Sequence, residues 1–247
     1  FIMMQITEMP MASLLDGFLA SNLMGQAIVL VQIASSIVAA AIVIGKTKEL
    51  NGLLRNHRRF VREFIAGKDV LGLYLMRKKM PMTTLAMIYD RTCERLIGFL
   101  NPEQRRAVIG RQDLGLESAS LSPREIELVR STCEHTMQEE EVRVEQGMGM
   151  LATIVTASPM LGLLGTVWGV LDAFACMGEK NTILLSVIAP AISSALVTTV
   201  VGLLVAIPSA IFYNNLAGKV RQVNIDMEGF ADEFLGRIAC EFQGRSE

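Results

Sequence analysis

The chain has 247 residues, of which 51% are hydrophobic and 19% are charged, and its formal net charge is -2. An average soluble domain has about 25% charged residues, and here the shortage is concentrated in three stretches without Asp, Glu, Lys or Arg, at 17–45, 146–171 and 181–218. Because about 20 apolar residues span a bilayer as a helix, the sequence predicts an integral membrane protein and argues against a soluble enzyme, a disordered chain, a disulfide-stapled secreted module and a nucleic-acid binder.

The three uncharged stretches predict transmembrane helices, because a backbone inside a bilayer must satisfy its own hydrogen bonds. Of the 23 Lys and Arg residues, 18 lie between the first and second stretches and none precedes the first. Since segments rich in Lys and Arg remain in the cytoplasm, we expect the N-terminus outside and the C-terminus inside. The predicted order is a periplasmic segment at 1–22, a first span at 23–45, a cytoplasmic helical segment at 46–145, a second span at 146–171, a periplasmic loop at 172–181, a third span at 182–213 and a cytoplasmic C-terminal helix at 214–247. The fold class is therefore an all-α membrane protein with three transmembrane helices and a long helical cytoplasmic extension.

The charged middle segment and the tail also predict helices. Asn101-Pro102-Glu103 and Ser122-Pro123-Arg124-Glu125 are typical helix starts, with Pro at the first helical position. We expect the acidic run Glu139-Glu140-Glu141 on a solvated helix face. After Lys219, apolar residues recur at helical spacing, which predicts that the third helix continues beyond the membrane and packs against the cytoplasmic segment. These residues are Val220, Val223, Met227, Phe230, Phe234, Ile238 and Phe242.

Motifs for catalysis or metal binding do not occur: the sequence has no HExxH, Walker-type phosphate loop, GxGxxG or CxxC. We expect His57 and His135 to be surface residues rather than ligands. Three of the four cysteines, Cys93, Cys133 and Cys240, lie in the predicted cytoplasmic part, so no intrachain disulfide is expected. The sequence therefore predicts no enzyme, no metal site and no cofactor.

Small and hydroxylated residues line one face of the second and of the third span. In the second span they are Ser158, Gly162, Gly165, Thr166 and Gly169, and their spacing favours close helix packing. In the third span they are Ala191, Ala195, Thr198, Gly202, Ala206 and Ser209, with Ser194 and Thr199 on the flanks. Pro190 and Pro208 are expected to loosen the backbone of that span locally. We expect that one hairpin alone cannot cover these faces, so other helices must do so.

The second and third spans form a predicted antiparallel hairpin. Thr166 and Thr199 are equidistant from position 182–183, so a turn centred there places the two threonines level. A level pair of hydroxyls would line a narrow polar path if several subunits surround it, and interhelical hydrogen bonding is the alternative; the residues alone leave both open. The same symmetry predicts that Asp172 is level with Ser194.

Two motifs resemble those of a known family. The run Gly162-Leu163-Leu164-Gly165-Thr166-Val167-Trp168-Gly169-Val170 resembles the second-span motif of the TolQ/ExbB proteins, and 189–208, followed by Tyr213-Asn214, resembles their third-span motif. The wider family includes the flagellar stator protein MotA, but the Gly-Thr-Val-Trp-Gly run indicates the TolQ/ExbB branch. The resemblance implies an inner-membrane proton-channel subunit that forms a homopentamer around two copies of a TolR/ExbD-like single-span partner. Together with a TonB/TolA-like protein, such a stator converts proton motive force into mechanical work on periplasmic or outer-membrane machinery.

The resemblance also implies roles for particular residues. The family's pore threonines correspond to Thr166 and Thr199, and Ser194, Thr198 and Asp172 are the other candidates for the ion pathway. TolQ and ExbB usually carry a Glu where this chain has Ser194, and a serine cannot hold a negative charge at neutral pH. Either Asp172 has replaced that Glu, or Asp172 only ends the second span and an Asp of the partner alone carries the proton. A non-conducting membrane scaffold remains the alternative function, and a solute transporter is disfavoured by three spans without an inverted repeat.

Overall fold

The computed structural model describes residues 22–67, 69–75, 83–109, 121–180 and 185–242, and every regular element within these ranges is an α-helix. The predicted all-α class is thus confirmed. Three stretches of the described chain are long and apolar enough to cross a membrane, within Leu23–Ala66, Pro123–Ala175 and Ala191–Phe242. The chain divides into two compact units, which are described one at a time.

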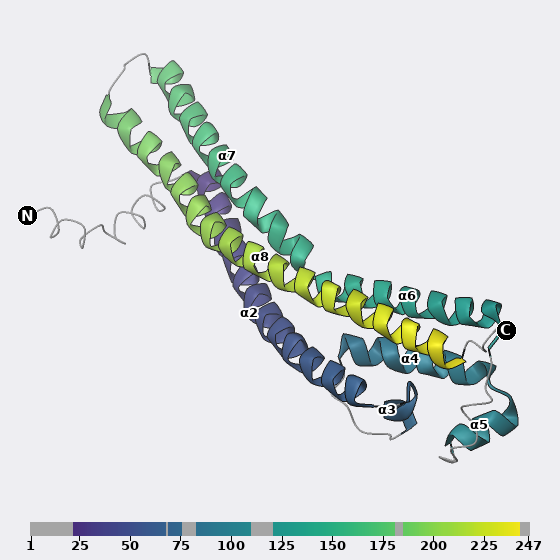
Figure 1. Cartoon of the computed structure of the whole chain (residues 1–247). Helices are drawn as coiled ribbons and strands as arrows, with labels where there is room; N and C mark the ends of the chain where they lie inside the picture. The colour runs from purple at the N-terminus through teal and green to yellow at the C-terminus, as the bar shows by residue number, and fades with distance from the viewer. Residues whose placement is uncertain (1–21, 68, 76–82, 110–120, 181–184, 243–247) are drawn as a thin grey trace, which may run out of the picture. The chain divides into compact units, whose positions relative to one another are not determined.

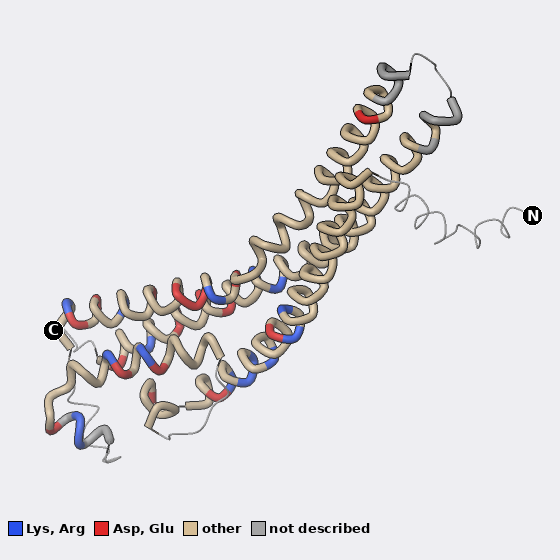
Figure 2. Tube along the Cα trace, turned by 180° about the vertical axis from the view of Figure 1, so that it is seen from behind, with Lys and Arg blue, Asp and Glu red and all other residues tan. Residues whose placement is uncertain are grey.

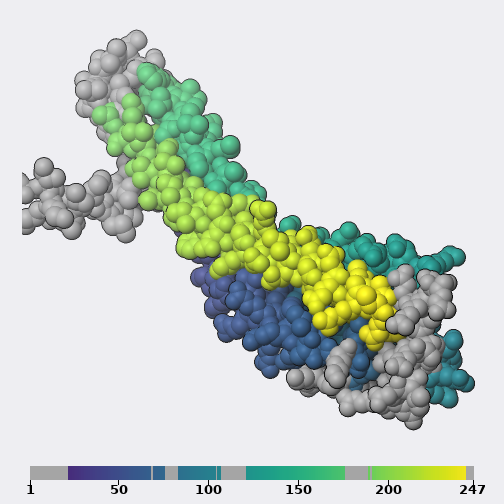
Figure 3. Space-filling model, in the orientation of Figure 1, coloured from purple at the N-terminus to yellow at the C-terminus, as the bar shows by residue number. Residues whose placement is uncertain are grey.

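The first unit comprises the residues up to Lys46 together with Gly147–Leu216. It contains the first half of α2 (Leu23–Ala66), the whole of α7 (Met148–Lys180) and the first half of α8 (Leu185–Phe242), which lie side by side (Figure 1). Figure 2 shows that charged residues are almost absent from these helices, and Figure 3 shows α8 directly against α7 on one face of this unit. Large apolar side chains such as Leu163, Leu171 and Ile207 point outward, as expected for helices covered by lipid or by other membrane helices.

The end of α7 differs from the expected span limit, and the prolines of α8 do not interrupt its helix. α7 continues to Lys180, so most of the residues predicted to form the loop at 172–181 are helical. α8 stays helical through both Pro190 and Pro208. Each proline lacks the backbone N–H that would donate one helical hydrogen bond. The hydrogen bonds of the neighbouring turns nevertheless keep α8 helical over its 58 residues.

Gly147 separates α6 (Pro123–Glu145) from α7. Its φ angle of 88° lies in the left-handed region, which glycine adopts at little cost and other residues adopt rarely. The glycine thus ends one helix and allows the next to begin immediately.

The second unit comprises Thr47–Gln146 and the chain from Ala217 onward. It contains the rest of α2 and α8, together with α3 (Gly72–Leu75), α4 (Thr84–Phe99), α5 (Pro102–Ile109) and α6. Five aromatic rings form the centre of its core, with ring centroids 5.1–5.9 Å apart: Phe60, Phe64, Tyr89, Phe230 and Phe234. The seven apolar residues predicted after Lys219 are all buried, so the third helix does continue and pack as expected.

The helix starts in this unit follow the sequence signals, but two burial expectations were wrong. α5 begins at Pro102, and Ser122 and Glu125 form a reciprocal capping box at the start of α6. His57 is not on the surface: only 1% of it is exposed, because its face of α2 packs against α4 and α8. Glu140 is buried as well, whereas its neighbour Glu139 is exposed and pairs with Arg91.

Candidate functional site

The small-residue faces of α7 and α8 pack against one another within the chain. A Cβ added at Gly169 would lie 2.5 Å from the Ala195 Cβ, and one added at Gly162 would lie 2.8 Å from the Thr199 Cα. Real Cβ atoms do not approach other atoms so closely, so glycine is what permits this contact. The expectation that one hairpin alone cannot cover these faces is met only in part: the two faces cover one another from Gly162 to Gly169, whereas Gln32 of α2 contributes at Ser158 and Gly202.

Two threonine hydroxyls of α8 meet one carbonyl of α7. The Thr199 hydroxyl donates a hydrogen bond to the Gly162 oxygen at 2.8 Å, and the Thr198 hydroxyl lies 3.1 Å from the same oxygen. Thr198 also lies 2.7 Å from the Ala195 oxygen of its own helix, and it is 1% exposed. Thr198 is thus enclosed in the helix interface, while Thr199 is half-buried and reaches its edge.

The two candidate pore threonines are not level. Thr199 lies opposite Gly162, and Thr166 is one helical turn farther along α7, about 6 Å by the rise of an α-helix. The Thr166 hydroxyl donates to the Leu163 oxygen of its own helix at 2.7 Å. The expected register was wrong because it assumed a turn centred at 182–183, whereas the fit of glycines against Thr198 and Ala195 sets the actual register.

Asp172 and Ser194 are also displaced from one another. Gly169 lies against Ala195, so Ser194 faces position 170 and Asp172 is two residues, about 3 Å, farther along α7. The Ser194 hydroxyl donates to the Ala191 oxygen at 2.9 Å. The Asp172 carboxylate instead accepts a hydrogen bond from the side-chain amide of Asn22, just before α2.

Asn22 nevertheless connects these two candidates. Asn22, Ser194 and Thr198 line the same small cavity of about 10 Å³, together with Trp168 and the backbone of neighbouring turns. That volume is close to the room that one water molecule needs. Polar side chains from the start of α2 and from α8 therefore line the same cavity beside α7.

Sequence reasoning missed two polar residues of α2 and its start. Asn22 precedes the predicted first span, and no sequence pattern links it to Asp172. Gln32 was overlooked although it is a large polar residue inside an uncharged stretch, which is the signal that could have identified it. Its side chain is fully buried and donates to the Ser158 oxygen of α7 at 3.3 Å.

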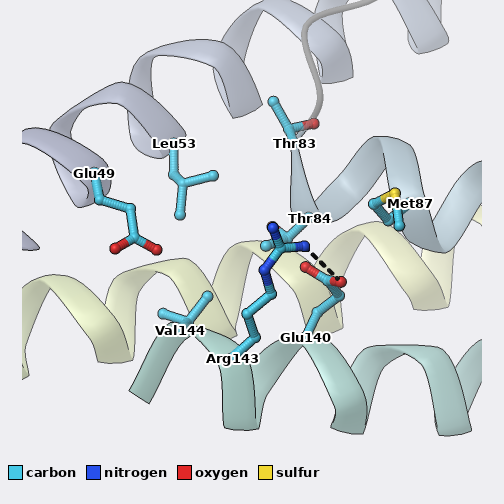
Figure 4. A pocket seen from close by; sticks show the side chains of 8 residues that line it. All are labelled: Glu49, Leu53, Thr83, Thr84, Met87, Glu140, Arg143 and Val144. Carbon is cyan, nitrogen blue, oxygen red and sulfur yellow. Dashed lines mark hydrogen bonds and ion pairs between the residues drawn. The ribbon is translucent and has the colours of Figure 1, made fainter. Parts of the chain in front are cut away.

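The second unit contains a separate cavity of about 200 Å³ (Figure 4). Arg143 of α6 extends into it and pairs with the buried Glu140 at 3.4 Å, while Glu49 approaches from α2. Thr83 and Thr84, at the start of α4, form the opposite wall. The Arg143 guanidinium offsets the cost of burying the Glu140 carboxylate. The charged residues that line this cavity are thus accounted for by an ion pair within α6.

The buried histidine lies beside this cavity. The His57 Nε2 is 2.7 Å from the Thr84 hydroxyl, and its Nδ1 is 3.7 Å from a carboxylate oxygen of Asp226 in α8. Burial lowers the pKa of His57, and the nearby Asp226 carboxylate opposes this effect in part. The imidazole is thus held mostly neutral at the junction of α2, α4 and α8.

The described cysteines and histidines do not assemble a reactive or metal-binding centre. Cys93 and Cys133 are buried and Cys240 is exposed, and all three are free thiols. Burial raises the pKa of both interior thiols, that of Cys133 to about 11, so neither is a thiolate at neutral pH. Within the part of the chain that the structure describes, no group of three or more His, Cys, Asp or Glu side chains could hold a metal ion.

Comparison with known proteins gives consistent matches. The sequence model of the MotA/TolQ/ExbB proton channel family matches residues 111–229. The Tol-Pal system protein TolQ of Haemophilus influenzae is 30% identical over 230 residues, which cover 89% of this chain and 91% of that protein. The biopolymer transport protein ExbB of Salmonella typhimurium is 44% identical over 90 residues, 36% of this chain and 37% of the relative. TolQ of Pseudomonas aeruginosa is 38% identical over 95 residues, 38% of this chain and 41% of that protein.

Proposed function

Since the chain belongs to the TolQ/ExbB branch of the MotA/TolQ/ExbB proton channel family, we propose that it is the channel-forming subunit of an inner-membrane stator. In this proposal a TolR/ExbD-like protein is the partner, and proton flow between the two drives work on periplasmic or outer-membrane machinery. The available energy is about 2.3 kcal/mol per elementary charge for each 100 mV of membrane potential. The proposed orientation has the N-terminus in the periplasm and the second unit in the cytoplasm, which the charge distribution supports.

The observation that carries this proposal is the hydroxyl-bearing edge of the α7–α8 pair. Thr166 and Thr199 are half-buried at that edge, one turn apart, in stretches of α7 and α8 that carry no charged residue. Both hydroxyls donate to backbone carbonyls, so each keeps lone pairs that can accept from water or from a partner side chain. Two staggered acceptors form a stepped polar path, in place of the level pair expected from the sequence.

A proton carrier must be able to lose and regain its proton, and hydroxyls do not do this near neutral pH. Among the carboxyls of residues 146–213, Asp172 is the one with a described hydrogen bond. Its donor is the side-chain amide of Asn22, just before α2. We propose that Asp172 receives the proton on the periplasmic side and that the partner's Asp carries it onward.

The test is proton flux in liposomes that contain the whole complex with its TolR/ExbD-like partner. Thr166→Val and Thr199→Val keep the side-chain shape but remove the hydroxyl, so both should assemble normally and lower the flux. Thr156→Val is the matched control, because Thr156 is an exposed threonine of α7 whose hydroxyl bonds only within its own helix. Normal flux in both pore variants would contradict the proposed pathway.

Asp172 is tested in the same assay. Asp172→Asn should abolish flux without changing assembly, and Asp172→Glu should restore part of it because a carboxyl is present again. Unchanged flux in Asp172→Asn would leave the partner's Asp as the carrier. A wild-type complex that assembles but carries no protons would instead support the non-conducting scaffold.

The proposed assembly is a ring of five chains around two partner helices. The support is family membership, together with the large apolar side chains that α7 and α8 present outward, such as Leu163, Val167 and Leu203. Native mass spectrometry in mild detergent with the partner present should give a 5:2 complex. A stable monomer or dimer under those conditions would count against the ring.

A further inference from the structure

Gln32 is a fully buried polar residue in the centre of the first unit. It lies in the middle of the apolar half of α2 and has no exposed surface. Its amide nitrogen donates to the Ser158 oxygen of α7 at 3.3 Å, whereas its oxygen Oε1 has no hydrogen-bond partner among the described residues. A primary amide inside a membrane helix bundle is costly when only partly bonded, so a purely apolar side chain would pack here at lower cost.

The amide occupies the point where all three helices of the unit meet. A Cβ added at Gly202 of α8 would lie 2.6 Å from the Ser158 oxygen and 2.9 Å from the Gln32 nitrogen. Gly202 therefore leaves the space that lets the Gln32 amide reach a backbone carbonyl of α7. The contact depends on α2, α7 and α8 together rather than on one pair of helices.

The Ser158 carbonyl is one helical turn before Gly162. In an α-helix the amide of residue i donates to the carbonyl of residue i−4, so the Gly162 amide also points at the Ser158 oxygen. The Gly162 carbonyl, in turn, accepts the hydroxyl of Thr199 at 2.8 Å. A continuous set of hydrogen bonds thus runs from Gln32 through this turn of α7 to Thr199.

We propose that Gln32 is a positioning residue that holds the Ser158–Gly162 turn of α7 in the register at which Thr199 faces the ion path. The inference rests on the proposed function, because the register of Thr199 affects activity only if Thr199 lines that path. The Gln32 amide meets α7 at the Ser158 oxygen, one helical turn from the Gly162 carbonyl that accepts the Thr199 hydroxyl, and acts on Thr199 only through that turn. The first span then has a part in conduction although none of its residues contacts the ion.

The experiment measures proton flux against pH in liposomes that hold the complete complex with its partner. Gln32→Leu removes the amide and should lower flux by about threefold, the factor that corresponds to an average side-chain hydrogen bond within a membrane protein. Gln32→Glu can donate to the Ser158 oxygen only while its carboxyl is protonated. It should therefore approach wild-type flux at low pH and fall more steeply than the wild type as the pH rises, in addition to the pH dependence that the proton-carrying carboxyls give to both proteins. Ser35→Ala is the control, since the Ser35 hydroxyl bonds the Val31 oxygen of its own helix at 2.7 Å, and it should leave flux unchanged.

A double variant separates positioning from a general structural role. If Gln32 acts through Thr199, combining Gln32→Leu with Thr199→Val should reduce flux no further than Thr199→Val alone. Multiplied losses would overturn the inference, as would wild-type flux in Gln32→Leu or a Gln32→Glu profile parallel to that of the wild type. If the wild-type complex carries no protons, the proposed function fails. The positioning role of Gln32 is then tested by thermal unfolding of the wild type, Gln32→Leu, Thr199→Val and the double variant. Additive effects of the two substitutions on stability would refute that role.

Discussion

Replacing Gly202 by alanine tests whether the packing of α8 on α7 and α2 is as close as the structure indicates. The added Cβ would lie 2.6 Å from the Ser158 oxygen and 2.9 Å from the Gln32 nitrogen, both below the 3.0 Å that real Cβ atoms keep. Restoring an ordinary contact of 3.4 Å at the Ser158 oxygen requires the helices to separate by about 0.8 Å. Overpacking of this kind costs about 1–3 kcal/mol.

Gly45→Ala is the matched control for this substitution. Gly45 is in the interior of α2, in the same unit, and a Cβ there would meet nothing within 4 Å. An alanine in a helix interior is more favourable than a glycine by about 0.5–1 kcal/mol, and both substitutions gain this. The difference between the two variants therefore isolates the overpacking, and Gly202→Ala should be the less stable one by about 1–3 kcal/mol.

The assay is thermal unfolding in one detergent, followed by the fluorescence of Trp168. Trp168 is the single tryptophan of the chain and lies on α7 of the same unit, so the signal reports on the packing that changes. For a chain of this size, each kcal/mol shifts the midpoint by about 2–4 °C. A midpoint for Gly202→Ala equal to or above that of Gly45→Ala would refute the close approach of the three helices.

The second unit gives three further predictions. Burial lowers the pKa of His57, so the folded chain binds that proton less readily than the unfolded chain, and stability should fall as the pH drops below about 6.5. His57→Gln should flatten this part of a plot of unfolding midpoint against pH. An unchanged slope would contradict the lowered pKa of His57. Phe234→Ala should cost about 3–5 kcal/mol in denaturant unfolding, because Phe234 is fully buried among the aromatic rings; the exposed Phe212→Ala is its control, and equal losses would argue against the ring cluster as the core. Ser122→Ala removes the capping box of α6 and should cost about 1 kcal/mol in the same measurement. Since Glu125 reaches back to Ser122, a Glu125→Ala substitution should add little to the loss in Ser122→Ala, whereas fully additive losses would argue against a reciprocal cap.

Much of the fold could be predicted from patterns that each depend on a few neighbouring residues. Uncharged stretches indicated the three apolar helices, and the spacing from Val220 to Phe242 predicted the buried face of the end of α8. Helix starts at Pro102 and Pro123 followed from local backbone chemistry. These features are predictable because neighbours in sequence determine them.

The site was less predictable, because it depends on how separate helices fit together. The relative height of Thr166 and Thr199 follows from glycines of α7 meeting Thr198 and Ala195, and a symmetric turn is a poor guide to that fit. His57 is buried because α4 and α8 cover one face of α2. The charged residues around His57 in the sequence predict an exposed position instead. The roles of Asn22 and Gln32 depend on their hydrogen-bond partners, Asp172 and Ser158, which only the packed structure brings next to them. Contacts over more than a hundred residues leave no periodic signal in the sequence.

The sharing of α2 and α8 between the two units has a consequence for biosynthesis. The first unit needs residues 147–216 and the second needs the chain from Ala217 onward, so neither unit is complete until its part of α8 has been synthesised. Until then, the face of α7 that carries Gly162 and Gly169 has no α8 packed against it. Phe60, Phe64 and Tyr89 likewise lack their contacts with the rings of Phe230 and Phe234. A nascent chain therefore exposes both unfinished surfaces at once, and at about 5–20 residues per second the 58 residues of α8 take several seconds to make. A premature stop in α8 before Leu216 would leave both units incomplete, so the quality control of the cell would meet such a product as wholly misfolded rather than as one folded domain with a missing end.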